Sequence, residues 1–344
     1  MSAAILLAAG ITSFAGVQPQ LAAGGGAVYL TFAAADAISV ARSTDAGATF
    51  TTPVILPGAG KLALGRHRGP RVAATRDAVI VAAIAGARGG GADGDVVLYR
   101  SVDRGRTWSP SIVINDVPGA AREGLHALTA NDAGLVIVAW LDLRDKGTRV
   151  YAATSRDHGA TWSPDALVYA SPSGSICECC HPSVAIDDGD GVAVLFRNHV
   201  DDRRDMYVVR SRDGATFGLA VKQGTGSWPL DACPMDGGAI ATAGGTVHTV
   251  WRRDTTIYAV ATAAGAAASG PETALGDGRD AVLAIAGGRI DAAWTGAAGV
   301  QLRQHGRAPM ALGPGGYASL LAFPDRTVAA IEHQGRVAVH VVER

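Results

Sequence analysis

The chain has 344 residues and a formal net charge of −1, with 48% hydrophobic and 18% charged residues. This length allows one large domain or two ordinary ones with a sizeable core. The near-neutral charge argues against a nucleic-acid-binding protein, and no apolar run reaches the ~18 residues of a membrane span.

The first 16 residues, MSAAILLAAGITSFAG, have two interpretations. Their apolar stretch has the length of an export signal, yet the first cationic side chain is Arg42, whereas a secretory leader begins with positive charge. The other interpretation is a β-strand, in which AAILLAA would supply a strand that the last repeat of the chain lacks. Both interpretations stay open at this point.

Four turn segments repeat along the chain. They read STDAGATF (43–50), SVDRGRTW (101–108), SRDHGATW (155–162) and SRDGATF (211–217), the last one residue shorter. The Asp can cap backbone N–H groups, the Gly supplies a positive φ, and the aromatic residue anchors the turn in the core. The shared pattern therefore predicts hairpin turns.

Each turn follows a short strand, a longer apolar strand and an alternating strand, for example LHALTA, GLVIVAW and RVYAATS. Seven such units begin near Gln18, Gly69, Gly124, His181, Asp236, Asp280 and Gly316. Sheets of four strands repeated radially predict an all-β fold, a β-propeller that forms one domain over residues 1–344. We expect seven blades, with six as the alternative, and a monomer, because a closed propeller leaves no edge strand to pair.

The Asp turns resemble the Asp-box, or BNR, repeats of the sialidase superfamily, and the resemblance covers most of the chain. Many Asp-box propellers are not sialidases, so the function must be argued from the site. Local motifs extend the resemblance. They imply substrate-binding arginines at Arg68 in HRGP, Arg88 in GARGGGADGD, Arg197 in VLFRN, and Arg252 or Arg253 in VWRRD. They also imply catalytic residues at Asp93 in GARGGGADGD and Tyr317 in GGYASLLAF. In this scheme three arginines hold a carboxylate, Asp93 is the general acid/base and Tyr317 is the nucleophile, with Glu332 further on.

The chain departs from the sialidase pattern in blade number and in the spacing of these motifs. Where the family has the glutamate that activates its tyrosine, this chain has Cys180 and His181. Ordinary structural roles also fit three of the candidates. Arg252 could form an ion pair between blades, Asp93 could be a turn residue, and Tyr317 could be a packed aromatic residue.

Three of the four cysteines lie in SICECCHPSVAID (175–187) and are followed directly by a histidine; the full set is Cys177, Cys179, Cys180, His181 and Cys233. Thiolates and an imidazole at this spacing suit copper or zinc. Disulfides are the second interpretation, if the protein is exported, and buried structural thiols are the third. Because Cys180 and Cys233 precede the first strands of adjacent units, we expect both at one mouth of the central channel, near Arg197.

Three functions follow from these patterns. The first is an exported, periplasmic or secreted, sialidase-like glycoside hydrolase that acts on an acidic sugar at the channel mouth. The second is a propeller that binds copper or zinc and serves as a redox enzyme or metal carrier. The third is a non-catalytic glycan-binding propeller. In each case the expected partner is a small molecule or a glycan.

Overall fold

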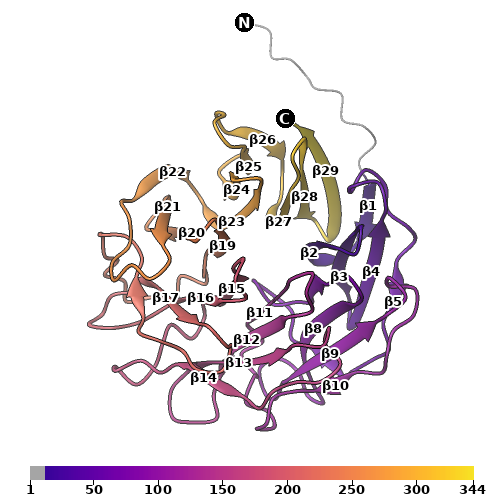
Figure 1. The fold of residues 1–344 in the computed structure, drawn as a ribbon, viewed down its shortest axis with the longest axis horizontal. Coiled ribbons are helices and arrows are strands. Elements are labelled where there is room, and N and C mark those ends of the chain that lie inside the picture. Colours follow the sequence, from indigo (N-terminus) through magenta and orange to yellow (C-terminus); the bar gives the residue numbers. More distant parts are fainter. Residues whose placement is uncertain (1–11) are drawn as a thin grey trace, which may run out of the picture.

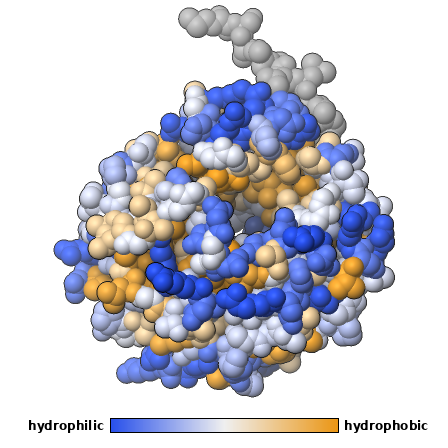
Figure 2. Space-filling view, viewed as in Figure 1, coloured by the Kyte–Doolittle hydropathy of each residue, from blue (hydrophilic) through white to orange (hydrophobic). Residues whose placement is uncertain are grey.

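The computed structural model describes residues 12–344, which form β-strands and no helix. The strands make seven antiparallel sheets arranged around a central axis, so the fold is the predicted seven-bladed β-propeller (Figure 1). In the space-filling view of the same face, the centre of the ring is hollowed (Figure 2). Within the described residues there is no helix long and apolar enough to cross a membrane.

Each blade begins with its innermost strand and continues outward. Blade 1 contains β2 (Val17–Gly24), β3 (Ala27–Ala34), β4 (Ala37–Ser43) and β5 (Val54–Ile55), and blade 2 contains β6 (Lys61–Leu62), β7 (Arg71–Ala74), β8 (Val79–Gly86), β9 (Asp95–Ser101) and β10 (Ile112–Val113). Blade 3 contains β11 (His126–Ala130), β12 (Val136–Asp142), β13 (Arg149–Ser155) and β14 (Ala166–Tyr169). Blade 4 contains β15 (Ser183–Ile186), β16 (Val192–Arg197), β17 (Met206–Ser211) and β18 (Val221–Lys222).

The last three blades follow the same plan. Blade 5 contains β19 (Ala239–Ala243), β20 (Thr246–Arg253), β21 (Thr256–Ala263) and β22 (Thr273–Asp277). Blade 6 contains β23 (Arg279–Ala286), β24 (Arg289–Gly296), β25 (Gly299–Arg303) and β26 (Met310–Gly313). Blade 7 contains β27 (Gly316–Ala322), β28 (Arg326–His333) and β29 (Arg336–Glu343), and β1 (Thr12–Ala15) completes it. The strand starts agree with the seven units expected from the sequence.

The N-terminal segment closes the ring. Strand β1 pairs antiparallel with β29, so that Phe14 lies opposite Val337, and the two ends of the described chain meet in blade 7 (Figure 1). The Phe14 ring also stacks on Phe32 of blade 1, with ring centroids 5.4 Å apart. The segment AAILLAA, which the sequence offered for this closing strand, lies outside the described residues.

The hydrophobic core is divided among the contacts between blades. In residues 12–344, each pair of neighbouring blades encloses its own cluster of buried apolar side chains, and Leu30 of blade 1 packs in one cluster with Val328 of blade 7. The second strand of a blade supplies much of this core because both of its faces are covered, as in β12, whose residues are all buried. Burial of this apolar surface is the main force that holds the blades together.

The four Asp turns, in blades 1 to 4, each pack on the preceding blade. In the turn after β13, Asp157 accepts hydrogen bonds from the backbone N–H and the hydroxyl of Thr161, at 2.9 and 2.6 Å. The turn glycine, Gly159, has φ 79° and packs so closely on Ile80 of blade 2 that a Cβ atom would lie 2.8 Å from its Cγ1. The sequence pattern thus specifies a local turn and also a contact between blades.

Blade 2 carries an insertion that matters for the site. Strands β6 and β7 both pair with β8, β6 near its C-terminal end and β7 nearer its start, and residues 63–70 connect them. A bridge between Gly65 and Arg68 tightens this connection, and His67 within it has a left-handed backbone with φ 58°. The insertion therefore presents a compact loop beside the inner strands.

Candidate functional site

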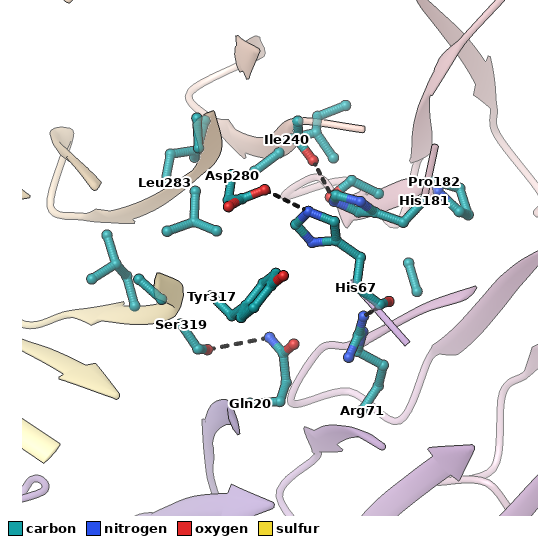
Figure 3. Close-up of a pocket in the computed structure, with 18 of the residues that line it drawn as sticks. Gln20, His67, Arg71, His181, Pro182, Ile240, Asp280, Leu283, Tyr317 and Ser319 are labelled. Carbon is teal, nitrogen blue, oxygen red and sulfur yellow. Dashed lines mark hydrogen bonds and ion pairs between the residues drawn. The ribbon is translucent and has the colours of Figure 1, made fainter. Parts of the chain in front are cut away.

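The inner strands line a polar cavity at the channel mouth (Figure 3). Three of them, β2, β23 and β27, carry a bulge at the same place, where the pairing register with the second strand shifts. The bulged residues Gln18, Asp280 and Tyr317 have φ values of 55°, 56° and 49°. Residues other than glycine rarely adopt a positive φ. Bulges commonly change the direction of a side chain next to a functional site. Blades 1, 6 and 7 thus use one backbone device to direct three different side chains into the cavity.

An imidazole–carboxylate pair occupies this cavity. Nε2 of His67 lies 2.8 Å from Oδ1 of Asp280, and the two side chains are 11% and 3% exposed. Burial alone would raise the pKa of Asp280, but the hydrogen bond and charge of His67 outweigh it, so the pKa is lowered and the carboxylate is ionised at neutral pH. The backbone N–H of Asp280 also donates to Oδ2 of Asp236, at 3.0 Å, so the backbone of Asp280 is anchored to the neighbouring blade 5.

Two further rings contact His67. Its imidazole stacks on that of His181, with centroids 4.2 Å apart, and meets the ring of Tyr317 edge to face at 5.4 Å. Nε2 of His181 is held by the carbonyl oxygen of Gly238 at 3.1 Å, while its Nδ1 is buried with no partner among the described residues. Burial lowers the pKa of His181 well below its ordinary value, so this ring is neutral. The hydroxyl of Tyr317 makes no hydrogen bond within residues 12–344 and lies toward His67 in Figure 3.

Arg71 brings positive charge to the cavity without a carboxylate partner in the described chain. Its guanidinium donates to the backbone oxygens of His67, Gly69 and Pro70, at 2.6, 3.4 and 3.3 Å. Burial lowers its pKa to about 10, so it stays charged at neutral pH. Nearby His126 is fully buried, and burial lowers its pKa to about 3. The cavity therefore combines the cation Arg71 with the His67–Asp280 pair and the neutral rings of His126 and His181. Arg71 is the group among these that suits an anionic ligand.

Of the residues implied by the sialidase resemblance, Tyr317 lies in this cavity, and so does His181 from the cysteine motif. Arg68, next to His67, turns away and donates from Nε to the backbone oxygen of Glu123. Asp93 caps the loop after β8, where the backbone N–H groups of Arg88 and Gly89 donate to its carboxylate and lower its pKa. A carboxylate held ionised in this way is a turn residue and a poor general acid.

The two later arginines lie together, outside the residues that line the cavity. Arg197 is 1% exposed, and its guanidinium donates to three backbone oxygens, those of Asp236, Arg204 and Arg252. Arg252 approaches Asp236, with Nε 3.5 Å from Oδ2, so its ion pair lies within blade 5 and not between blades as considered from the sequence. Neighbouring Arg253 pairs with Glu272 at 2.6 Å. The structure therefore does not bring three arginines together around Tyr317.

The remaining candidate, Glu332, serves the inner strand of blade 1. Its Oε2 accepts a hydrogen bond from the backbone N–H of Gln18, at 2.7 Å, and lies 3.3 Å from the side-chain amide nitrogen of the same residue. Glu332 thus supports the bulged residue of the next blade, and the acidic group that contacts His67 beside Tyr317 is Asp280.

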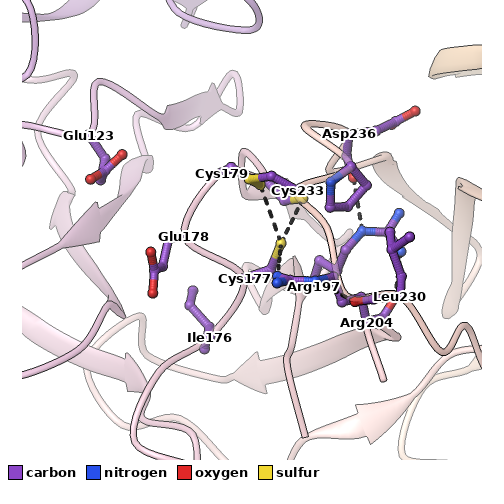
Figure 4. Close-up of a disulfide and its surroundings, with 12 residues drawn as sticks. Glu123, Ile176, Cys177, Glu178, Cys179, Arg197, Arg204, Leu230, Cys233 and Asp236 are labelled. Carbon is purple, nitrogen blue, oxygen red and sulfur yellow. Dashed lines mark hydrogen bonds between the residues drawn. A yellow bond between two sulfur atoms is a disulfide. The ribbon is translucent and has the colours of Figure 1, made fainter. Parts of the chain in front are cut away.

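The four cysteines lie beside this site, in the loops that lead into β15 and β19 (Figure 4). Cys179 and Cys233 form a disulfide, which links the two loops, and Cys177 and Cys180 are free and buried. A hydrogen bond joins the thiol groups of Cys177 and Cys180, with the sulfurs 2.9 Å apart. This bond lowers the pKa of Cys177 to about 6 against the effect of burial, with help from Arg197 and Arg204, whereas burial raises the pKa of Cys180.

A metal could be held by the sulfurs but not by the whole motif. The Sγ atoms of Cys177, Cys179 and Cys180 all lie within 4.8 Å of one another. The imidazole of His181, by contrast, faces the channel against His67 and Gly238. The cysteine motif thus contributes to two places, a sulfur cluster behind the strand ends and a histidine in the cavity.

Sequence reasoning missed His67, Asp280 and Arg71 as site residues. His67 stands next to Arg68 in HRGP, and its left-handed backbone separates the directions of the two side chains. Asp280 and Arg71 each stand at or just after the start of a repeat unit. A polar residue at that place in several units was the signal that could have found them.

Comparisons with known proteins agree with this architecture. The family model of the BNR repeat-like domain matches residues 26–221. A sialidase from Trypanosoma rangeli shares 12% identity and a TM-score of 0.51 over 85% of this chain and 56% of its own, so this chain spans about half its length. A polysaccharide lyase described as a PL25 ulvan lyase bound to -[GlcA(1-4)Rha3S]- shares 12% identity and a TM-score of 0.55, covering 96% of this chain and 94% of its own. No curated protein matches the sequence.

Proposed function

The chain belongs to the family of BNR repeat-like domains, and from this premise we propose that it cleaves an acidic glycan at the mouth of its central channel. The observation that carries the proposal is the convergence of His67, Asp280 and Tyr317 beside the unpaired cation Arg71. The imidazole of His67, oriented by the carboxylate of Asp280, can act as a base, and the phenol of Tyr317 can act as the matching acid. The guanidinium of Arg71 suits a sugar carboxylate.

The reaction that these groups suit best is β-elimination next to a uronate carboxylate. In the neutral form of His67, Nε2–H donates to Asp280, and the lone pair on Nδ1 can remove the proton α to the carboxylate. The hydroxyl of Tyr317 gives its proton to the departing glycosidic oxygen. The electron pair of the broken C–H bond forms a C=C bond as the C–O bond breaks, so no water is consumed. Arg71 stabilises the negative charge that develops on the carboxylate.

The structural neighbours support an acidic substrate. One is a sialidase, and the other is a polysaccharide lyase bound to -[GlcA(1-4)Rha3S]-. At 12% identity these likenesses concern the fold, so the substrate class is argued for this chain from Arg71 and the His67–Asp280 pair.

Hydrolysis is the second candidate reaction, favoured by the presence of Tyr317 in the cavity. It would use Tyr317 as a nucleophile and a water to release the sugar. The residues that the sialidase scheme would add, Arg68, Arg197 and Asp93, make other contacts in this chain. An exported location is also part of the proposal, because the disulfide between Cys179 and Cys233 is typical of oxidising compartments.

The test is incubation of the purified protein with a panel of uronate-containing polysaccharides and with sialosides. We expect new chain ends from a uronate polymer, together with the ultraviolet absorbance of an unsaturated sugar. His67→Gln should abolish both signals, and His248→Gln, on strand β20, should leave them intact. Release of sialic acid would contradict the elimination and favour hydrolysis, and no cleavage of any acidic glycan would contradict the proposal as a whole.

A further inference from the structure

The sulfur cluster is a separate chemical feature of the molecule. Cys177, Cys179 and Cys180 form a small buried cluster, and the side chain of Met235 packs against it. Among the described residues, no histidine nitrogen or carboxylate oxygen joins the three Sγ atoms in this group. Met235 has φ 51°, an unfavourable backbone for methionine, and this conformation accompanies the packing of its side chain on the cluster. The donors available here are therefore sulfur atoms alone.

A buried positive charge stands next to these sulfurs. Arg197 is 1% exposed, and in residues 12–344 its guanidinium bonds only to backbone oxygens, with no ion pair to a carboxylate. Arg204 donates from Nη1 to Sγ of Cys177, at 3.3 Å, and also has no carboxylate partner in the described chain. A buried guanidinium is costly unless a negative charge is close to it. The two free thiols of the cluster can supply such a charge as thiolates, and the carboxylate of nearby Asp236 already faces Arg252.

We propose that Cys177 and Cys180 bind one Cu(I) ion as thiolates, with the thioether of Met235 as a third ligand. Thiolate and thioether sulfurs are the ligands that select Cu(I). Two thiolates and Cu(I) together carry one negative charge, which is placed favourably beside the guanidinium groups of Arg197 and Arg204. The two Sγ atoms, 2.9 Å apart, must separate to admit the ion. Zinc fits less well, because structural zinc takes four nitrogen, oxygen or thiolate ligands, and here Cys179 and Cys233 are joined to each other.

The ion has a route to this site. Met235 is half-buried and Cys233 is exposed, so the cluster lies just beneath the surface between the loops that precede β15 and β19. The ion would bind behind the strand ends, whereas the glycan site lies in the channel. Copper binding therefore goes beyond the proposed glycan cleavage and stands independently of it.

The experiment is an anaerobic titration of the full chain with Cu(I), in competition with a chromophoric Cu(I) chelator. We expect one ion per chain, and the X-ray absorption spectrum of the bound copper should show sulfur neighbours only. Loss of a residue that only supports a ligand costs up to ~100-fold in metal affinity, so Cys177→Ser and Cys180→Ser, which remove a ligand, should each weaken Cu(I) binding by more than that. Met235→Leu should weaken Cu(I) binding by on the order of tenfold. Met310→Leu, at an exposed methionine, is the matched control and should change nothing.

The double variant Cys179→Ala/Cys233→Ala removes the disulfide but keeps both proposed thiolates and Met235. It should bind Cu(I) within about tenfold of the wild-type affinity. The spectrum of the wild-type protein needs no variant, so the proposal stays testable if a substitution prevents folding. Failure to compete with the chelator, nitrogen or oxygen neighbours in the spectrum, or tighter binding of Zn(II) than of Cu(I) would each overturn it.

Discussion

Nε2 of His67 lies 2.8 Å from Oδ1 of Asp280, although the two residues are 213 positions apart and belong to blades 2 and 6. These blades are not neighbours in the ring, so the loop between β6 and β7 reaches across the channel mouth. The same imidazole contacts His181 of blade 4 and Tyr317 of blade 7. One inserted loop therefore gathers residues from four blades at the axis of the propeller.

Replacing Asp280 by asparagine should lower kcat by about a hundredfold or more, with little change in KM. Asparagine can no longer stabilise the imidazolium that forms when His67 takes a proton, and it can hold the ring in the wrong tautomer. Steady-state kinetics on the glycan identified by the panel provide the measurement. Asp277→Asn, at an exposed position of β22, is the control. A loss confined to KM would mean that Asp280 only binds substrate.

Tyr317→Phe should remove most of the activity while leaving the fold unchanged, because it deletes only the hydroxyl that lacks a partner in the described chain. The expected fall in kcat is about a hundredfold to ten-thousandfold, the range for loss of one acid–base group. Tyr207→Phe on β17 removes a hydroxyl outside the cavity and serves as the comparison. Full activity of Tyr317→Phe would eliminate the phenol from the mechanism.

The stability of the protein should fall as the pH drops below about 6.5, partly because of His126. Burial lowers the pKa of this histidine to about 3, so the unfolded chain takes up its proton first and the native state loses free energy of unfolding as the pH falls. At about pH 5 this amounts to roughly 2 kcal/mol for this one group. Denaturant unfolding of His126→Gln should show a weaker pH dependence between about pH 7 and 5. The same substitution at exposed His333 should leave the wild-type slope, and equal slopes for both variants would contradict the assignment.

Gly159→Ala should destabilise the propeller by more than an ordinary glycine substitution. A Cβ atom there would lie 2.8 Å from Cγ1 of Ile80, in addition to requiring φ 79°. Gly26→Ala is a close match, since Gly26 has φ 75° and no heavy atom within 4 Å of its added Cβ. We expect about 1 kcal/mol for Gly26→Ala and about 1–3 kcal/mol more for Gly159→Ala in the free energy of unfolding. Equal costs would mean that the turn does not tighten the contact between blades.

The blades could be predicted from the sequence because their information is local and repeated. The turn around Asp157 closes through hydrogen bonds to Thr161, four positions away, and the strands before it are short, mostly apolar runs bounded by turn residues. The resemblance to sialidase motifs pointed to Tyr317 and the cysteine motif to His181; both stand at the start of a repeat unit.

The contacts of the site were less accessible to prediction. His67 and Asp280 meet only because the loop between β6 and β7 crosses the channel, and no spacing in the sequence encodes that distance. The motif HRGP predicted Arg68 as the site residue, whereas His67, which has a left-handed backbone, is the residue of this motif that lines the cavity. Cys180 and Cys233 could be placed at one mouth by strand order, but the pairing of Cys233 with Cys179 could not be deduced from spacing.

The most direct test of the account is the mass spectrum of the products formed in water enriched in heavy oxygen. Elimination by His67 and Tyr317 consumes no water, so we predict an unsaturated uronate product whose mass shows no oxygen taken from the solvent beyond the exchange of a reducing-end control. A saturated product that carries one solvent oxygen would demonstrate hydrolysis and contradict the proposed mechanism.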